Sequence, residues 1–128
     1  MIVNPKSGRK QRLRGILERK YASLVAQLGP RLTPMQATLN EIFGRGRIHT
    51  VGWIPGQDWS TSHGGVFQPI YEVCRVRAQT HDEAHDEAAR CYGLIAWMVF
   101  QEHARAWASG HGMKDGREIR SRTYWLWE

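Results

Sequence analysis

The sequence predicts a mainly α protein of the α+β class, with an N-terminal helical hairpin, a long central helix and a small C-terminal β-hairpin packed on that helix. Three observations lead to this prediction. Residues 80–109 combine a capping signal with a long apolar run, two shorter helical stripes precede them, and the last residues alternate in polarity after an Asp-Gly turn. We expect a flexible lead-in over residues 1–8 and one domain over residues 9–128, which is long enough to bury a core.

The N-terminal hairpin is predicted from two helical stripes. Over residues 9–28 apolar residues recur at helical spacing, and Gly29-Pro30 ends the helix. A second helix over residues 33–43 is predicted to begin with a capping box, in which Thr33 is the N-cap and Gln36 its partner. Because only a short link joins the two helices, they should pack against each other as a hairpin.

The middle of the chain is less regular. Residues 48–54 contain β-branched residues and Trp53, which indicates a short strand. Residues 56–65 are turn-forming residues around Trp59 and predict a loop. Such a loop either binds a partner or lets Trp59 fill the core beneath it, and we favour the second interpretation. Residues 66–78 fit a helix or a strand; a helix is favoured because Pro69 is unsuited to a central strand.

The central helix is predicted over Thr80 to Ser109. Thr80 is a suitable N-cap and Glu83 completes a capping box, while further carboxylates crowd the first two turns. Gly110 is a natural stop. The middle turns are apolar on nearly all sides, which is typical of a helix buried by several neighbours. The apolar run over residues 92–100 is too short to cross a bilayer, so we expect no membrane partner.

The C-terminal segment alternates in polarity after Asp115-Gly116, a strong hairpin turn signal. One set of positions includes Trp125 and Trp127 and is expected to face the central helix. The other set includes Arg120, Arg122 and Tyr124 and is expected to be exposed.

Charge gives the main indication of function. The chain has a net charge of +6, and residues 1–50 contain ten Lys or Arg against two acidic residues. This excess indicates an anionic partner, so we expect a small, basic, non-enzymatic cytoplasmic protein that engages nucleic acid or a nucleoprotein complex, chiefly through phosphate contacts. The expected contact residues are Lys6, Arg9, Lys10, Arg12, Arg14, Arg45, Arg47, Arg120, Arg122 and Tyr124. The second helix offers little positive charge beside a groove, which disfavours a helix-turn-helix.

Two alternatives stay open. Small size and basic charge are also typical of accessory proteins of phages and mobile elements that act as protein-binding inhibitors or adaptors; the contacts would then include Trp53, Trp59 and His63. A metal-dependent hydrolase is the second alternative, because His81 and His85 lie at i and i+4. Two exposed histidines in a solvated first turn are favoured over that site. One host protein and a second copy of this chain are further candidate partners.

The two cysteines show no metal-type pairing and indicate a reduced cytosolic compartment. Cys91 lies on the apolar side of the central helix, where thiols are usually inert. No Ser-based nucleophile motif accompanies the serines and His63 of the 56–65 loop. We therefore expect no catalytic residues and no cofactor.

Overall fold

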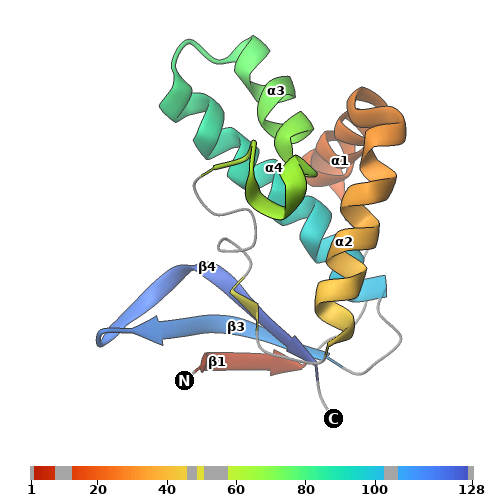
Figure 1. The fold of residues 1–128 in the computed structure, drawn as a ribbon. Coiled ribbons are helices and arrows are strands. Elements are labelled where there is room, and N and C mark those ends of the chain that lie inside the picture. Colours follow the sequence, from red (N-terminus) through yellow and green to blue (C-terminus); the bar gives the residue numbers. More distant parts are fainter. Residues whose placement is uncertain (1, 8–12, 46–48, 51–57, 103–106, 127–128) are drawn as a thin grey trace.

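A computed structural model describes residues 2–7, 13–45, 49–50, 58–102 and 107–126 (Figure 1). The described helices are α1 (Gly15–Leu28), α2 (Leu32–Gly44), α3 (Gln68–Arg77) and α4 (His81–Glu102), with short 3-10 turns at Gly29–Arg31 and Ser62–Gly65. The strands are β1 (Ile2–Ser7), β2 (His49–Thr50), β3 (Trp107–Lys114) and β4 (Arg117–Leu126). The mainly helical class predicted from the sequence is confirmed.

The connection between α1 and α2 differs from the prediction. Arg31 donates hydrogen bonds from its guanidinium to the carbonyl oxygens of Leu28 and Gln27, at 3.2 and 3.1 Å, and so satisfies free acceptors at the end of α1. The chain then passes through the 3-10 turn directly into α2, with Arg31 in a helical conformation at the N-cap. The capping box predicted at Thr33 is wrong, because such a box needs an extended N-cap residue and a helical turn occupies its place.

The core forms around α4, which packs against α3, α2 and α1. Ala84 and Ala88 are fully buried on α4 and allow its neighbours to approach closely. Phe43 of α2 meets Phe100 of α4 edge to face, with ring centroids 5.1 Å apart. The sequence pattern therefore correctly identified the central helix and its buried character.

The start of α4 is capped as predicted. The backbone N–H of Glu83 donates to the Thr80 hydroxyl oxygen at 3.2 Å, and the Glu83 carboxylate accepts the backbone N–H of Gln79 at 3.0 Å. The helix over residues 66–78 is also confirmed, since α3 occupies Gln68–Arg77 with a proline in its first turn.

The predicted continuation of α4 to Ser109 is wrong. The helix ends at Glu102, and β3 begins at Trp107 because its backbone pairs on one side with β1 and on the other with β4. Pairing between distant strands overrides the helical pattern of these residues. Residues 103–106 lie outside the described ranges.

The strands form an antiparallel sheet in the order β1-β3-β4-β2. Residues 2–7 differ from the predicted flexible lead-in because they form its edge strand β1. Ile2 and Val3 are β-branched and suit a strand, and Pro5 falls where the register shifts between Val3 and Lys6. A proline, which lacks an N–H, is tolerated on an edge strand or at such a bulge.

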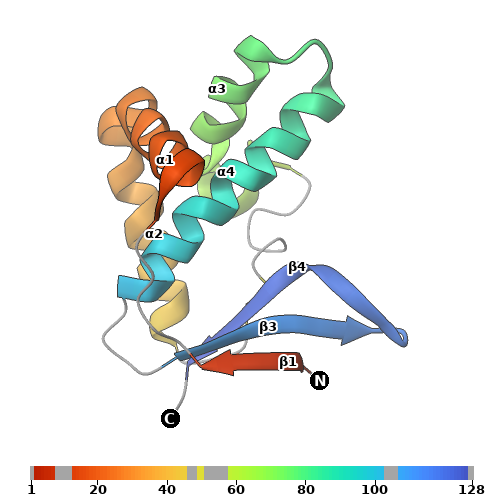
Figure 2. The same cartoon turned by 180° about the vertical axis from the view of Figure 1, so that it is seen from behind.

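Strands β3 and β4 are joined at Asp115 and Gly116, whose φ angles are 53° and 75°. Two consecutive residues with positive φ are typical of a type I′ hairpin turn. Figures 1 and 2 show the four helices gathered on one side of the sheet, with β1 on the edge farthest from them. The fold thus consists of a helical body and a small sheet layer.

Candidate nucleic-acid interface

Positive charge is divided unequally between the two layers. The helical ranges 13–45 and 58–102 contain eight Lys or Arg and nine Asp or Glu. The rest of the chain, which includes all four strands and the segments adjoining them, contains ten Lys or Arg and three Asp or Glu. The whole excess of positive charge therefore belongs to the sheet and the segments next to it.

Several cations of the helical body have partners within the protein. The Lys20 ammonium lies 2.7 Å from the Glu87 carboxylate, and the Arg45 guanidinium lies 3.2 Å from the Glu41 carboxylate. Arg31 is 3.7 Å from Glu72 in addition to its two backbone bonds. Arg45, one of the expected contact residues, thus sits next to a carboxylate that partly offsets its attraction for a phosphate.

Strand register brings expected contact residues from distant parts of the chain together. Lys6 pairs with Ser109, Ser109 with Tyr124, and Tyr124 with His49, so these four form one row across all four strands. The adjacent row on the same face is Val3, His111 and Arg122. Residues directly opposite each other in antiparallel strands share a face of the sheet. We call the face that holds these two rows the Lys6–Arg122 face.

Two neighbouring residues of β3 differ in exposure. His111, which belongs to the Lys6–Arg122 face, is partly exposed, whereas Gly110, the next residue on β3 and a member of the opposite face, is buried. The opposite face contains Ala108 paired with Trp125 and Gly110 paired with Thr123.

Not all expected contact residues join that face. Arg14 is exposed at the N-cap of α1, in an extended conformation, on the helical body. Arg120 lies on β4 between Glu118 and Arg122, where the register with β3 shifts. Four expected contact residues lie outside the described ranges: Arg9, Lys10, Arg12 and Arg47.

The loop around Trp59 serves the core. Trp59 is only 4 % exposed and meets Tyr92 edge to face at 6.3 Å. Its indole N–H donates a hydrogen bond of 2.9 Å to Nδ1 of His85 on α4. The prediction that Trp59 fills the core is confirmed, and its alternative role as an exposed protein-binding residue is wrong because the side chain is already buried. His63 is exposed, and Trp53 lies outside the described residues.

Asp58 fixes this loop from the adjacent position. Its carboxylate accepts hydrogen bonds from the hydroxyls of Ser60 and Thr61, at 2.6 and 2.8 Å, and from the backbone N–H of Ser60 at 3.0 Å. These bonds, led by the one from the Ser60 hydroxyl, lower the pKa of Asp58 because they favour its charged form. Asp58 therefore holds the turn that directs Trp59 into the core.

His81 and His85 have local partners. Nδ1 of His81 and the Tyr71 hydroxyl share a hydrogen bond of 2.5 Å, while Nδ1 of His85 accepts the Trp59 bond. The two imidazole rings stack with centroids 6.2 Å apart. Within the described residues no group of three His, Cys, Asp or Glu is arranged to hold a metal ion. The pair alone is too few ligands for the hydrolase alternative.

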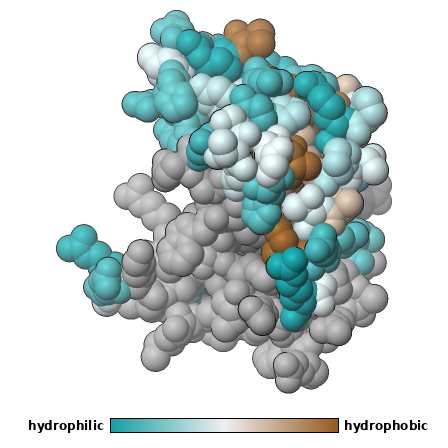
Figure 3. All heavy atoms as spheres, viewed as in Figure 1, coloured by the Kyte–Doolittle hydropathy of each residue, from teal (hydrophilic) through white to brown (hydrophobic). Residues whose placement is uncertain are grey.

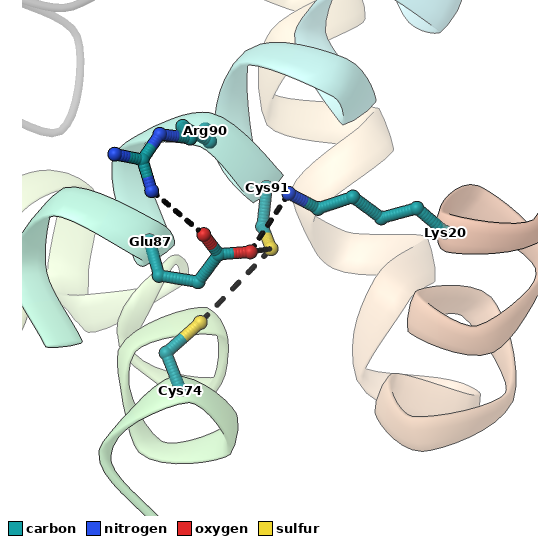
Figure 4. A network of polar contacts seen from close by, with 5 residues as sticks. All are labelled: Lys20, Cys74, Glu87, Arg90 and Cys91. Atoms are coloured by element: carbon teal, nitrogen blue, oxygen red, sulfur yellow. Dashed lines mark hydrogen bonds and ion pairs between the residues drawn. The ribbon is translucent and has the colours of Figure 1, made fainter. Parts of the chain in front are cut away.

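A polar network joins α1, α3 and α4 on another side of the helical body (Figure 4). The Glu87 carboxylate forms ion pairs with the Lys20 ammonium and with the Arg90 guanidinium, which lies 2.9 Å from the carboxylate. The Cys91 thiol donates to the Glu87 carboxylate at 3.6 Å, and the Cys74 thiol donates to the Cys91 sulfur at 4.0 Å. The Lys20 hydrogen bond is the main reason why the pKa of Glu87 is lowered.

Comparison with protein-family models, with curated proteins and with solved structures finds no match for this chain. Within the described ranges, none of the helices has an apolar stretch sufficient for a membrane crossing.

Sequence reasoning missed two arrangements. The sequence pattern places Ser109 at the end of the central helix and His111 beyond it, so it does not predict their position beside Tyr124 and Arg122. The pairing of Cys74 with Cys91 was also missed. One signal was present in the sequence: both cysteines lie on helical stripes that are joined by a link of only three residues, 78–80.

Proposed function

We propose that this protein binds nucleic acid through the Lys6–Arg122 face of its sheet. The observation that supports this most strongly is the strand register, which brings Lys6 from the start of the chain to the same row as Tyr124 from its end. Lys6 and Arg122 would contact phosphates, and Tyr124 would stack on an unpaired base. A sheet surface with cations and an aromatic residue suits a single strand better than a duplex groove.

Sequence neighbours extend the proposed interface. Arg9, Lys10 and Arg12 follow β1 directly in the chain, Arg47 precedes β2 by two residues, and Arg120 belongs to β4. We propose that they add phosphate contacts around the Lys6–Arg122 face. The nearly neutral helical body would support the sheet without binding, with the C-terminal hairpin packed toward α4. A cytoplasmic, non-enzymatic role fits this arrangement.

Charge-removing variants test the assignment of the face. Lys6→Gln and Arg122→Gln should each weaken binding to single-stranded RNA or DNA and lower the slope of log K against log salt by about 0.7. Arg19→Gln is the matched control, because Arg19 is an exposed cation of α1, in the helical body. It should leave both affinity and slope unchanged. Equal effects at all three positions would mean that net charge, not this face, attracts the ligand.

The aromatic contact has a different signature. Tyr124→Leu should weaken binding of a single strand by about 1–3 kcal/mol without changing the salt slope, because a stacked base releases no counterions. Duplex binding should change much less. An equal loss for single strands and duplexes would contradict the stacking role.

A protein-binding adaptor, such as an accessory protein of a phage or mobile element, is a second candidate. It is favoured by two apolar side chains in the first turn of α1, Ile16 and Leu17, which are 74 % and 53 % exposed. On the face that Figure 3 presents, apolar residues form separate spots among hydrophilic ones. Replacing Ile16 and Leu17 by Ser should abolish binding to a host protein or to a second copy if this candidate is right, and should leave nucleic-acid binding intact.

A further inference from the structure

Two thiols face each other at the wall of a cavity in the helical body. The sulfur atoms of Cys74 on α3 and Cys91 on α4 are 4.0 Å apart, and each residue is 5 % exposed. Both line a cavity of about 310 Å³ between α1, α3 and α4, together with Lys20, Arg77 and Glu87. A small molecule in this cavity would lie against both cysteines, although these residues are largely covered.

We propose that Cys74 and Cys91 form a redox-active dithiol, which a small hydroperoxide entering this cavity oxidises to an intramolecular disulfide. The inference is independent of nucleic-acid binding, because the cavity lies between the helices and includes no residue of the Lys6–Arg122 face.

The surroundings give the two thiols different roles. The hydrogen bond between the two sulfur atoms lowers the pKa of Cys74, and the positive charges of Arg77 and Lys20 act in the same direction, while the negative charge of Glu87 opposes them. The same bond and burial raise the pKa of Cys91, which therefore keeps its proton. Because the thiolate is the nucleophile, Cys74 is the residue that attacks first. Cys91 is positioned beside it by its bond to Glu87.

With hydrogen peroxide as the hydroperoxide, the chemistry balances with one equivalent. The Cys74 thiolate attacks one peroxide oxygen, the O–O bond breaks, and Cys74 becomes a sulfenic acid while hydroxide leaves. The Cys91 sulfur then attacks the Cys74 sulfur; the S–S bond forms, the S–O bond breaks, and the departing hydroxide takes up the Cys91 proton as water. Two thiols are oxidised, one peroxide is reduced, and two waters result once the first hydroxide is protonated.

The distance between the sulfurs is compatible with this second step. A disulfide requires the sulfurs to move from 4.0 Å to about 2.05 Å. Rotation of the two side chains, together with a small shift of α3 relative to α4, would bring the sulfur atoms to this distance. Because the chain contains only two cysteines, no other thiol of the same molecule competes for the sulfenic acid.

The first test uses the reduced full-length protein and hydrogen peroxide. The reaction is stopped in aliquots taken at successive times. Each aliquot is unfolded, its free thiols are titrated, and its mass is measured by mass spectrometry. We expect both thiols to disappear together, with a mass loss of two hydrogens, no covalent dimer, and full recovery after dithiothreitol.

Variants then separate the two roles. Cys91→Ser should stop at a Cys74 sulfenic acid that dimedone traps, whereas Cys74→Ser should consume peroxide at least about tenfold more slowly. Arg77→Gln should slow thiol loss severalfold, because Arg77 lines the cavity and favours the thiolate. Arg75→Gln is the matched control, because it also removes one positive charge from α3, while Arg75 does not line the cavity and, among the described residues, bonds only to the carbonyl oxygen of Ala78. Circular dichroism verifies that each variant is folded.

Three results would overturn the proposal. The thiols could stay unreactive until the protein unfolds, they could oxidise independently to sulfinic acids, or they could form only intermolecular disulfides. A wild-type rate no faster than that of free glutathione would equally rule out an activated Cys74. None of these outcomes depends on whether the protein binds nucleic acid.

Discussion

The hydrogen bond between Trp59 and His85 offers a quantitative test of how the 58–65 loop is attached to the helical body. His85→Ala removes the acceptor of an indole N–H that belongs to a side chain only 4 % exposed. An unsatisfied buried donor costs about 1–3 kcal/mol. The lost edge-to-face contact, with ring centroids 5.9 Å apart, adds about 0.5–1 kcal/mol. Since His85 itself is only half-buried and water can reach part of the site, we expect His85→Ala to lower the free energy of unfolding by about 2 kcal/mol.

A double-mutant cycle measured by urea unfolding separates this bond from general effects on the helix. In a Trp59→Phe background the donor no longer exists, so His85→Ala should cost about 1 kcal/mol less than in the wild-type protein. Asp86→Ala is the control, because this neighbouring residue is exposed on the same helix. An equal cost of His85→Ala in both backgrounds would refute the reasoning that this bond anchors the loop.

Three further predictions concern the core, the cap and the ion pair of α4. Phe43→Ala should lower the free energy of unfolding by about 3–5 kcal/mol, because the ring is fully buried against α4. Calorimetry or urea unfolding would measure this change, and a loss below about 1 kcal/mol would contradict the packing. Thr80→Ala should cost about 1 kcal/mol by removing the hydrogen bond to the Glu83 N–H, whereas Thr80→Asp should retain most of the stability in the same assay. Glu87→Gln should cost at most about 1 kcal/mol at pH 7, because the pair with Lys20 is partly exposed and screened by water. The pKa of Glu87 is lowered in the folded state, so the contribution of its carboxylate to stability is complete above the ordinary pKa of 4.5 and is lost as the pH falls below it. The free energies of unfolding of the wild type and the variant should therefore converge in acid. A difference that persists there would argue against the ion pair.

Features that depend on residues close in sequence were predictable. The Thr80–Glu83 cap involves residues three apart, and the apolar stripe of α4 identifies a buried helix without knowledge of its neighbours. Trp59, the one large aromatic residue among the turn-forming residues of its loop, was also correctly expected in the core.

Features that depend on pairing between distant segments were not predictable. Residues 107–109 fit the helical pattern of α4, and they form a strand because β1, about a hundred residues earlier in the chain, pairs with them. The same pairing turns residues 2–7 from an expected lead-in into an edge strand. The meeting of Cys74 with Cys91 depends on the angle between α3 and α4, which side-chain packing determines and the sequence pattern does not.

The proposed interface has the same origin. Lys6, Arg122 and Tyr124 were each expected to contact nucleic acid, but from two separate patches at opposite ends of the chain. Only the order β1-β3-β4-β2 makes them neighbours on one surface, with Ser109 and His111 between them. The charge pattern thus indicated the class of partner, whereas the sheet topology determined the shape of the proposed site.

Binding of the pure protein to labelled single- and double-stranded RNA and DNA, measured while the salt concentration is stepped, tests the central proposal most directly. We predict micromolar or tighter binding to single strands, weaker binding to duplexes, and a linear fall of log K with log salt whose slope corresponds to about 0.7 per phosphate contact. Weak binding that is equal for all four ligands and absent at physiological salt would contradict the proposal and show that the charge of the sheet serves another purpose.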